Sequence, residues 1–346
     1  MYFFMALRNI IKYNKYNAIV ILLIAVITFI FFTGNSAVRR VERTIRRSYM
    51  ESLTGDVVIQ KKSDVSMNLF GANTLIIDSY FTIPVMPAYD DVMELVSVEK
   101  DVAGISSQVS GRAFLDFLNI REPVLLCGID ASSYFSLFPG IVLEEGRFLK
   151  NGEYGVMITE ERAQRMEKQS GIRPVIGMPL LFTSGGSVGF KIREAPLVGI
   201  FSYQNPGQFM NEIILIDPQT VRVLNSIQVA GAAGIKTEGN FFGLLGANSD
   251  DIFDADFGSG NTTEEEEFSV EFLENFLSAS KDIFGIAEVG GGWNFILLRL
   301  KKGISAKSFI QALNKKIEPF GLTAVNWRTA AGNFAILSLL IQILFN

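Results

Sequence analysis

The sequence predicts a membrane-anchored α+β protein, in which an N-terminal transmembrane helix and a partial second transmembrane helix flank a mixed α+β domain of two subdomains. The first observation is composition, because the 346 residues are 49% hydrophobic and 19% charged, whereas soluble domains carry about a quarter charged residues. The second is a stretch without charge over residues 16–38. The third is the irregular alternation of short β-rich and helical runs between residues 48 and 327.

The N-terminal region predicts a membrane helix over residues 18–38. The uncharged stretch of 23 residues would span about 34 Å as a helix, enough for a hydrocarbon core of about 30 Å. A cleaved signal peptide is the alternative, because small residues follow at 34–36. Before the span, residues 1–17 alternate apolar with basic side chains, so we expect an interfacial amphipathic segment, with a frayed terminus as the alternative.

The helical pattern continues beyond the span. Apolar residues at 38, 41, 45 and 49 recur at three- and four-residue spacing. We interpret residues 39–54 as a basic stalk helix that joins the membrane to the domain. A juxtamembrane helix whose side chains reach lipid phosphates is the other interpretation, and the two are compatible. The stalk carries five basic residues: Arg39, Arg40, Arg43, Arg46 and Arg47.

Charge is divided unevenly along the chain. Residues 1–47 hold eight basic residues and one acid, a net charge of +7, whereas the remainder holds 23 basic and 35 acidic residues, a net charge of −12. Phosphate backbones need a positive surface, so the acidic remainder makes nucleic acid an unsuitable partner.

The residue inventory argues against an enzyme. The chain has no histidine, which excludes Ser-His-Asp catalysis and His-ligated zinc. The single Cys127 cannot form an internal disulfide, and no Gly-Lys dipeptide offers a phosphate loop. Residues 185–189 match G-x-S-x-G, but a hydrolase needs a histidine base, so we expect a hairpin turn between 180–182 and 188–192. We expect no catalytic residue, cofactor or metal, and ATP hydrolysis on another chain.

Residues 230–266 are Gly-rich and then acidic, which predicts a long loop or insertion between two subdomains. Asp254, Asp256 and Glu265 nearly fit a calcium-binding loop. However, Gly258 occupies a position that should supply a ligand, and Ser259 occupies the position of the turn glycine. We expect a solvated acidic loop, with weak calcium binding as the alternative.

The remaining elements follow from period and turn signals. Asp217 and Pro218 suit the N-cap and first position of a helix, and Ser305 suits the cap of another. The uncharged residues 329–346 predict the start of a second membrane helix over 328–346, with a buried amphipathic helix as the alternative. We expect strands over 56–60, 124–129, 155–158, 195–201, 212–216, 295–300 and 322–326, and helices over 89–99, 160–166, 218–225, 267–280 and 305–317.

This order of segments resembles the MacB/FtsX-like permeases of ABC transporters, most of all their lipoprotein-releasing LolC/LolE and macrolide-exporter branches. Residues 7–59 are similar to their opening helix, span and first strand. The block over 125–166 is similar to their extracytoplasmic core signature, and "APLVGIF", "NEIILID" and "VNWR" fit the same pattern. The signature residues are structural ones that make turns and close contacts: Gly128, Asp130, Gly146 and Arg147.

The resemblance implies a permease subunit of the mechanotransmission type in the bacterial cytoplasmic (inner) membrane. It implies a separate cytoplasmic ABC ATPase, a second permease subunit as homo- or heterodimer, and transport such as lipoprotein release or export of other envelope cargo, with a lipoprotein or carrier as a further partner. Residues 1–17 would be cytoplasmic and residues 55–327 would form an extracytoplasmic MacB-like core domain. A membrane-anchored binding or sensor module without transport is the alternative, and a membrane-tethered hydrolase is a third.

The resemblance also leaves two points of tension. Three basic residues precede the span and five follow it, which alone would place the N-terminus outside, although a long following domain weakens that rule. The family has four spans, with the ATPase-contacting segment between the second and third. We therefore expect this sequence to be a fragment of a longer permease or a truncated product that does not transport by itself.

Overall fold

A computed structural model describes most of the chain, which divides into two compact units, residues 1–226 with 293–346 and residues 227–292. Almost all of the described residues belong to the first unit. Several predicted elements lie outside the described residues: residues 1–13 of the amphipathic segment predicted over 1–17, the acidic loop with Asp254, Asp256 and Glu265, the helix predicted over 267–280, and residues 334–346 of the predicted second span. The described ranges are 14–64, 67–72, 83–186, 189–204, 210–227 and 292–333.

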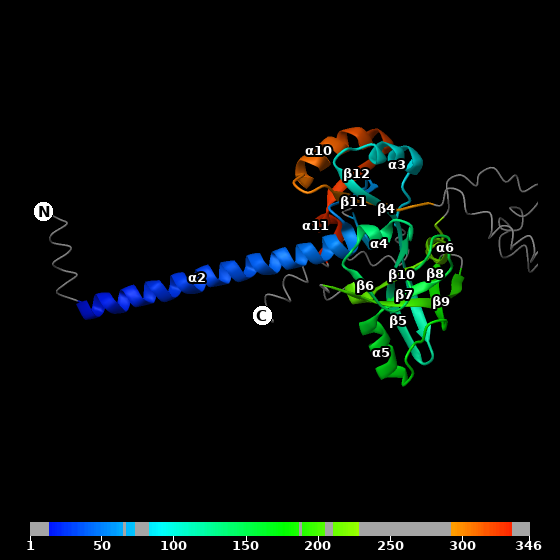
Figure 1. The fold of residues 1–346 in the computed structure, drawn as a ribbon, viewed down its shortest axis with the longest axis horizontal. Helices are drawn as coiled ribbons and strands as arrows, with labels where there is room; N and C mark the ends of the chain where they lie inside the picture. Colours follow the sequence, from blue (N-terminus) through cyan, green and yellow to red (C-terminus); the bar gives the residue numbers. More distant parts are fainter. Residues whose placement is uncertain are drawn as a thin grey trace, which may run out of the picture. The chain divides into compact units, whose positions relative to one another are not determined.

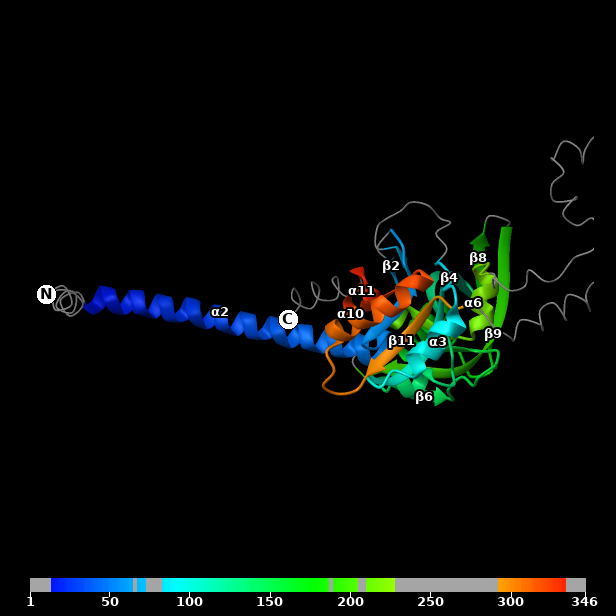
Figure 2. The same ribbon diagram turned by 90° about the horizontal axis from the view of Figure 1, so that it is seen from above.

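The first element is a single long helix, α2 (Asn14–Tyr49), followed by a π-helical turn, η1 (Met50–Thr54). Figures 1 and 2 show α2 as one continuous helix that leads into the domain. Its side chains over residues 18–36 are all exposed. By length and composition the stretch Ala18–Thr54 is able to cross a membrane, with a mean hydropathy of 2.5 over its most apolar window. The uninterrupted helix expected from the spacing is confirmed.

A ten-stranded sheet forms the domain, with the order β12-β1-β11-β4-β5-β10-β7-β9-β6, and β8 pairs with β4 and β9. Neighbours are antiparallel except for β10 with β5 and β7 with β9, so the topology is mixed. A separate two-stranded ribbon joins β2 (Met67–Asn68) to β3 (Gly71–Ala72). The strands of the large sheet are β1 (Val57–Lys61), β4 (Val102–Phe117), β5 (Ile120–Ile129), β6 (Ile141–Gly146), β7 (Val156–Thr159), β8 (Pro179–Gly186), β9 (Gly189–Tyr203), β10 (Ile213–Ile216), β11 (Phe295–Leu300) and β12 (Leu322–Asn326).

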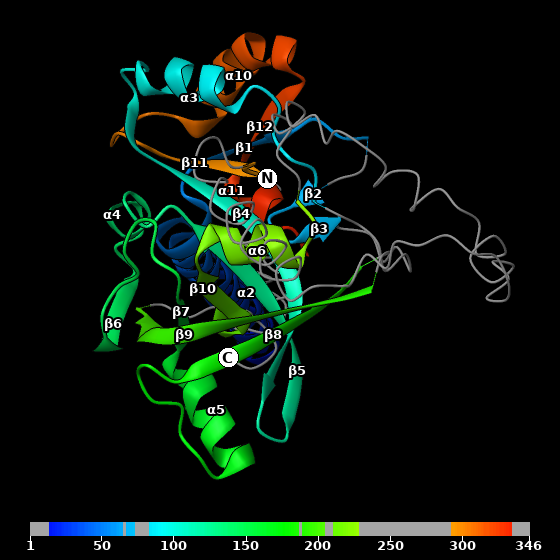
Figure 3. The ribbon, with the colours of Figure 1, turned by 90° about the vertical axis from the view of Figure 1, so that its right-hand side faces the viewer.

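Helices cover both faces of this sheet, which confirms the α+β class. In Figure 3, α3 and α10 lie together beside β1, β11 and β12, and their apolar side chains share one core cluster with those strands. Helix α6 contacts β4 and β5, and α5 contacts β7 and β9. The helix bounds are α3 (Tyr89–Ser97), α4 (Tyr134–Leu137), α5 (Glu160–Ser170), α6 (Pro218–Leu224), α10 (Ala306–Ile317) and α11 (Trp327–Ala331), with 3-10 turns η2 (Met210–Glu212) and η4 (Glu318–Phe320).

Strand β1 is apolar without alternation because it is buried on both faces. Successive side chains of a strand point to opposite faces. Val57 and Ile59 therefore enter the cluster under α3 and α10, while Val58 enters the second cluster, where α2 ends. All three have no exposed surface. This strand thus separates the two hydrophobic cores of the domain.

The sequence analysis missed β4, the longest strand. Its middle carries polar residues that are fully buried, such as Ser107 and Gln108, so it lacks the apolar period of a strand. Hydrogen bonds pair part of this polar set: the Ser107 hydroxyl lies 2.6 Å from the Tyr89 hydroxyl, and the Gln108 amide nitrogen donates to the Ser110 hydroxyl at 2.8 Å, whereas the Gln108 amide oxygen has no partner among the described residues. Strand β6 was also missed, since three of its six residues are Glu144, Glu145 and Gly146.

Most other expectations for the described residues are confirmed within a few positions. The β8–β9 hairpin pairs as far as Gly186 with Gly189. Asp217 caps α6 by accepting a hydrogen bond from the Thr220 N–H at 2.8 Å. The capping role expected for Ser305 is wrong, because it occupies the N-cap position of α10 without a side-chain hydrogen bond.

Contacts within the first unit hold the two segments that border residues 227–292 in the sequence. Arg222 of α6 stacks over the Trp293 ring at 4.8 Å. The buried Asn294 amide donates to the carbonyl oxygens of Ile83 and Pro84, and its oxygen accepts from the Ser110 N–H at 3.0 Å. Three segments distant in sequence therefore meet at one side chain.

A buried ion-pair cluster fixes α5 to the start of β5 and to η2. The Arg162 side chain has no exposed surface and pairs with Glu122 of β5 and with Glu212 at 2.8 Å. Arg165, one turn further, binds the same Glu212 carboxylate at 2.8 Å. Burial raises the pKa of Glu212, but the two arginines outweigh it and the net shift is downward. The Glu212 carboxylate is thus held in its charged form.

Substituting Arg162→Ala should lower the free energy of unfolding by about 3 kcal/mol, because it removes the buried guanidinium that two carboxylates share and leaves Glu122 with only a 4.0 Å contact to Arg165. Lys316→Ala is the control, since its pair with Glu99 is half-exposed and should contribute less than about 1 kcal/mol. Urea unfolding of both variants measures the difference. Equal losses for the two would contradict this account.

Candidate functional site

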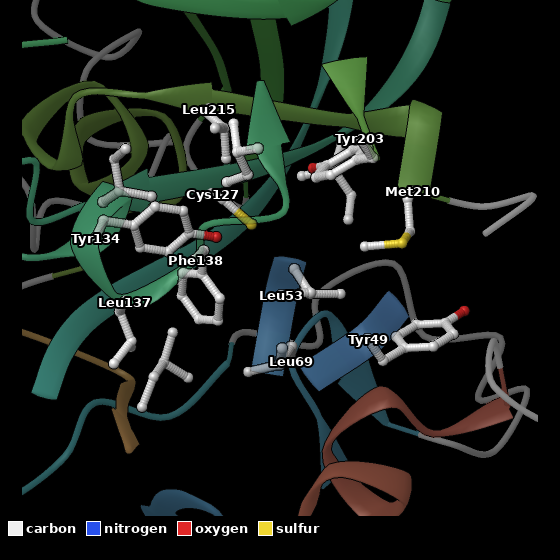
Figure 4. Packing of buried hydrophobic residues seen from close by; sticks show 14 of the residues in the cluster. Tyr49, Leu53, Leu69, Cys127, Tyr134, Leu137, Phe138, Tyr203, Met210 and Leu215 are labelled. Carbon is white, nitrogen blue, oxygen red and sulfur yellow. The ribbon is translucent and has the colours of Figure 1, made fainter. Parts of the chain in front are cut away.

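The end of the long helix is embedded in the domain. Ile45, Tyr49 and Leu53 are 4%, 2% and 2% exposed. By contrast, the side chains of α2 over residues 18–36 are all exposed. Their four-residue spacing places them on one face of the helix. They join the core cluster that includes Phe138 and Met210. Figure 4 shows Tyr49 and Leu53 among side chains of the sheet and of α4.

This junction is tightly packed. Its cavity measures about 10 Å³, which is room for about one water molecule. A cavity of this size does not admit a small-molecule ligand, and close packing transmits displacement from one element to the next. The lining residues are Tyr49, Leu53, Phe70, Leu125, Met210, Ile213 and Ala331.

The backbone of the π-helical turn is bound to two other segments. The Met50 carbonyl accepts from the Arg299 side chain at 2.9 Å, and the Glu51 carbonyl accepts from the Gly140 N–H at 3.1 Å. Gly55 then reverses the chain at φ 66°, and a Cβ there would lie 2.6 Å from the Leu298 carbonyl oxygen. Only glycine fits this position. The helix end is therefore fastened to β11 and to the segment before β6.

Helix α11 lies against α2 at the same place. Asn326 caps α11 by accepting from the Thr329 N–H at 3.0 Å. The rings of Tyr49 and Trp327 stack at 6.2 Å and 30°, and Arg328 forms an ion pair with Glu42 at 3.0 Å. The last helix of the described chain thus contacts the first one where both meet the domain.

The stalk arginines lie outside this packing. All five are exposed. Arg47 pairs with Glu51 at 2.9 Å, and the Arg46 Nε donates to the Met50 sulfur at 3.2 Å. Arg43 Nε donates to the Arg39 carbonyl at 3.2 Å. None of the five enters the core.

The first pair of signature residues lies where β5 ends. A Cβ on Gly128 would approach the Pro218 Cα to 2.7 Å, so glycine lets α6 pack closely on the strand. The Asp130 carboxylate accepts from the Ser132 N–H at 3.1 Å and from the Ser133 hydroxyl at 2.7 Å. These bonds set the turn that begins α4.

The second pair closes a loop after β6. Gly146 has φ 76°, and a Cβ there would lie 2.4 Å from the Val198 carbonyl oxygen, so this position requires glycine. The Arg147 guanidinium makes a two-pronged ion pair with Glu153, one arm at 2.6 Å. The hydrogen bond from Arg147 is the main reason that the pKa of Glu153 falls to about 2.

Both pairs frame the core that receives α2. Tyr134 and Phe138 follow the Asp130 turn, Leu149 follows Arg147, and all three belong to the same cluster as Tyr49 and Leu53. The four signature residues therefore shape the wall of the junction. The Tyr49–Trp327 and Glu42–Arg328 contacts were not expected from the sequence, because they join positions more than 270 residues apart and leave no local signal.

The chemistry of the described residues is that of packing. Burial raises the pKa of the Cys127 thiol well above its ordinary value, so the thiol is a poor nucleophile. Within the described ranges, no group of three Cys, Asp or Glu side chains is placed to hold a metal ion. Gly185 of the G-x-S-x-G match lies in β8, and Ser187 is outside the described residues.

Substituting Leu53→Ala should lower the free energy of unfolding by about 3 kcal/mol, because it opens a cavity in a core that cannot collapse around it. Leu22→Ala is the control, since Leu22 is 65% exposed on the same helix and makes no contact with the domain core. Chemical denaturation of both variants, followed by tryptophan fluorescence, measures the difference. Identical unfolding of the two would show that the helix end does not stabilise the domain.

The Arg147–Glu153 pair should make stability depend on pH below 4.5. A carboxylate whose pKa drops from 4.5 to about 2 on folding adds stability above pH 4.5 and loses that contribution as the pH falls toward 2. Arg147→Gln should flatten this dependence, and Glu153→Gln should flatten it equally. Unfolding midpoints over this pH range test the pair, and an unchanged slope in either variant would refute it.

Comparison with known proteins identifies the family. A family model described as MacB-like periplasmic core domain matches residues 18–316. No curated protein matches the sequence.

Three similar solved structures come from transport proteins. The periplasmic region of MacB from Actinobacillus actinomycetemcomitans is 12% identical, with coverage of 82% of this chain and 94% of that one and a TM-score of 0.41. The extracellular domain of the noncanonic ABC-type transporter YknZ from Gram-positive bacteria is 11% identical, with 78% and 99% coverage and a TM-score of 0.36. A domain of a putative permease protein from Porphyromonas gingivalis is 11% identical, with 80% and 89% coverage and a TM-score of 0.37.

Since the family model spans most of the sequence, the chain belongs to the family of the MacB-like periplasmic core domain, the domain found in ABC transporter permeases.

Proposed function

We propose that this chain is a permease subunit of an ABC transporter of the mechanotransmission type. A separate cytoplasmic ATPase moves the membrane helices, and α2 carries the movement to the domain. The observation that supports this most is the junction, where the last turns of α2 and η1 are part of the domain core.

The proposal needs a helix that does not bend where it enters the domain. No proline lies between residues 14 and 49, and α2 is unbroken over its 36 residues. Burial of Ile45, Tyr49 and Leu53 stabilises the junction by about 2 kcal/mol for each side chain. The ties from Met50 and Glu51 to other segments add to this. A displacement of α2 would therefore move the domain with it.

The setting of this function is part of the proposal. The N-terminus would lie in the cytoplasm, α2 would cross the bacterial inner membrane, and the domain would be extracytoplasmic. A second permease subunit and the ATPase would complete the transporter. The cargo would be a lipoprotein or another envelope component. The ATPase is assigned to a partner because this sequence has no Gly-Lys dipeptide for a phosphate loop.

The test uses the complete gene product, purified from membranes together with its ATPase. Thr44 is exposed on α2 just before the buried turns, and Thr44→Pro should kink the helix there at a cost of about 3 kcal/mol. Thr44→Ala is the matched control, since it removes the same hydroxyl and keeps the helix. Lys168→Cys, exposed on α5, accepts a fluorophore, and the buried Cys127 does not compete for it.

The measurement is energy transfer from this fluorophore to a labelled lipid headgroup, with and without ATP. Wild type and Thr44→Ala should show an ATP-dependent change, and Thr44→Pro should lose it while ATP hydrolysis continues. The absence of any ATPase from the purified complex would defeat the proposal, as would a full ATP-dependent change in Thr44→Pro.

A further inference from the structure

The five stalk arginines lie on one face of α2. At about 100° per residue they fall within an arc of about 120°. The residues that face the domain, with Ile45 and Tyr49 the most buried, occupy the opposite side of the helix. A membrane helix that only needs basic anchors does not need them on one side. The one-sided arrangement indicates a surface with a partner of its own.

Height along the helix divides the five arginines into two groups. The uncharged stretch ends at Val38, so Arg39 stands where the hydrocarbon would end. Arg43 lies about 6 Å further along the helix, within a headgroup layer that measures about 5 to 7 Å on each side of a bilayer. Arg46 and Arg47 lie about 10 to 12 Å beyond Arg39, above that layer.

The side-chain hydrogen bonds of Arg43, Arg46 and Arg47 point in the directions that this division predicts. Arg47 and Arg46 reach forward to Glu51 and Met50, toward the domain. Arg43 reaches back to the carbonyl of Arg39, toward the apolar end of the helix. Among the described residues, Arg47 has an acidic partner in an ion pair, whereas Arg39, Arg40, Arg43 and Arg46 have none. The lower three therefore carry charge that no ion pair with the described part of the domain neutralises.

We propose that Arg39, Arg40 and Arg43 bind the phosphate groups of anionic lipid headgroups. A guanidinium presents a planar fork of donors that matches phosphate oxygens, and side chains of a helix lean toward its N-terminus, which here is the direction of the bilayer. The three stand on a convex helix surface rather than in a pocket, so the bilayer must supply the phosphates as an array.

This surface would fix the rotation of α2 about its own axis. The arginine face would meet lipid, and the opposite face would meet the domain and α11. The inference rests on the part of the proposed function that places α2 in a membrane. It does not depend on the ATPase or on which side of the membrane the domain occupies, because headgroups are present on both sides.

The full chain is reconstituted in nanodiscs of equal parts phosphatidylcholine and phosphatidylglycerol, then extracted with detergent, and the retained lipids are measured by mass spectrometry. Wild type should retain phosphatidylglycerol above its bulk share. The triple variant Arg39→Gln, Arg40→Gln and Arg43→Gln should fall to the bulk share, since each basic residue near an anionic surface contributes roughly five-fold. The control Arg46→Gln with Arg47→Gln should retain the wild-type excess.

Three results would overturn the inference. They are an unchanged excess in the triple variant, an equal loss in the control variant, and displacement of the lipid by inorganic phosphate, which would identify a site for the free ion. All five side chains are exposed, so matching thermal midpoints should show that every variant is folded. A positive lipid result without any co-purified ATPase would reject the proposed transport role and leave this inference standing.

Discussion

The burial of the end of a long helix in the core of a domain is the constraint on which the rest of this structure depends. An exposed apolar helix and a mixed sheet are common parts, and neither determines how the other is oriented. Here Tyr49 and Leu53 belong to the same cluster as residues of the sheet and of α4. The domain cannot complete this core without the end of the helix, so the last turns of α2 and η1 are part of the domain.

Other features of the fold serve this core. Gly55 permits the sharp reversal from η1 into β1, and β1 passes between the two clusters with both faces buried. The turns at Asp130 and Gly146 set the course of the segments that form the far wall of the junction. Gly128, Asp130, Gly146 and Arg147 are thus packing and turn residues around the junction of α2 with the domain.

Sequence reasoning succeeded where the signal is local. The long helix, the β8–β9 hairpin and the Asp217 cap follow from period and turn chemistry. It failed where partners lie far apart in the chain. Strand β4 was missed because its middle is polar, and the contacts of the buried Ser107 and Gln108 form only in the folded structure. The buried Arg162 was missed for the same reason, since Glu122 and Glu212 are distant in sequence.

The contacts that border residues 227–292 have an evolutionary consequence. They are the hydrogen bonds of Asn294 with Ile83, Pro84 and Ser110 and the stacking of Arg222 over Trp293. It secures both borders of the intervening stretch 227–292 with contacts made wholly inside the first unit. Selection is therefore free to lengthen, shorten or exchange that stretch without disturbing the sheet. Variation among relatives should concentrate there, and the strands on either side should keep their register.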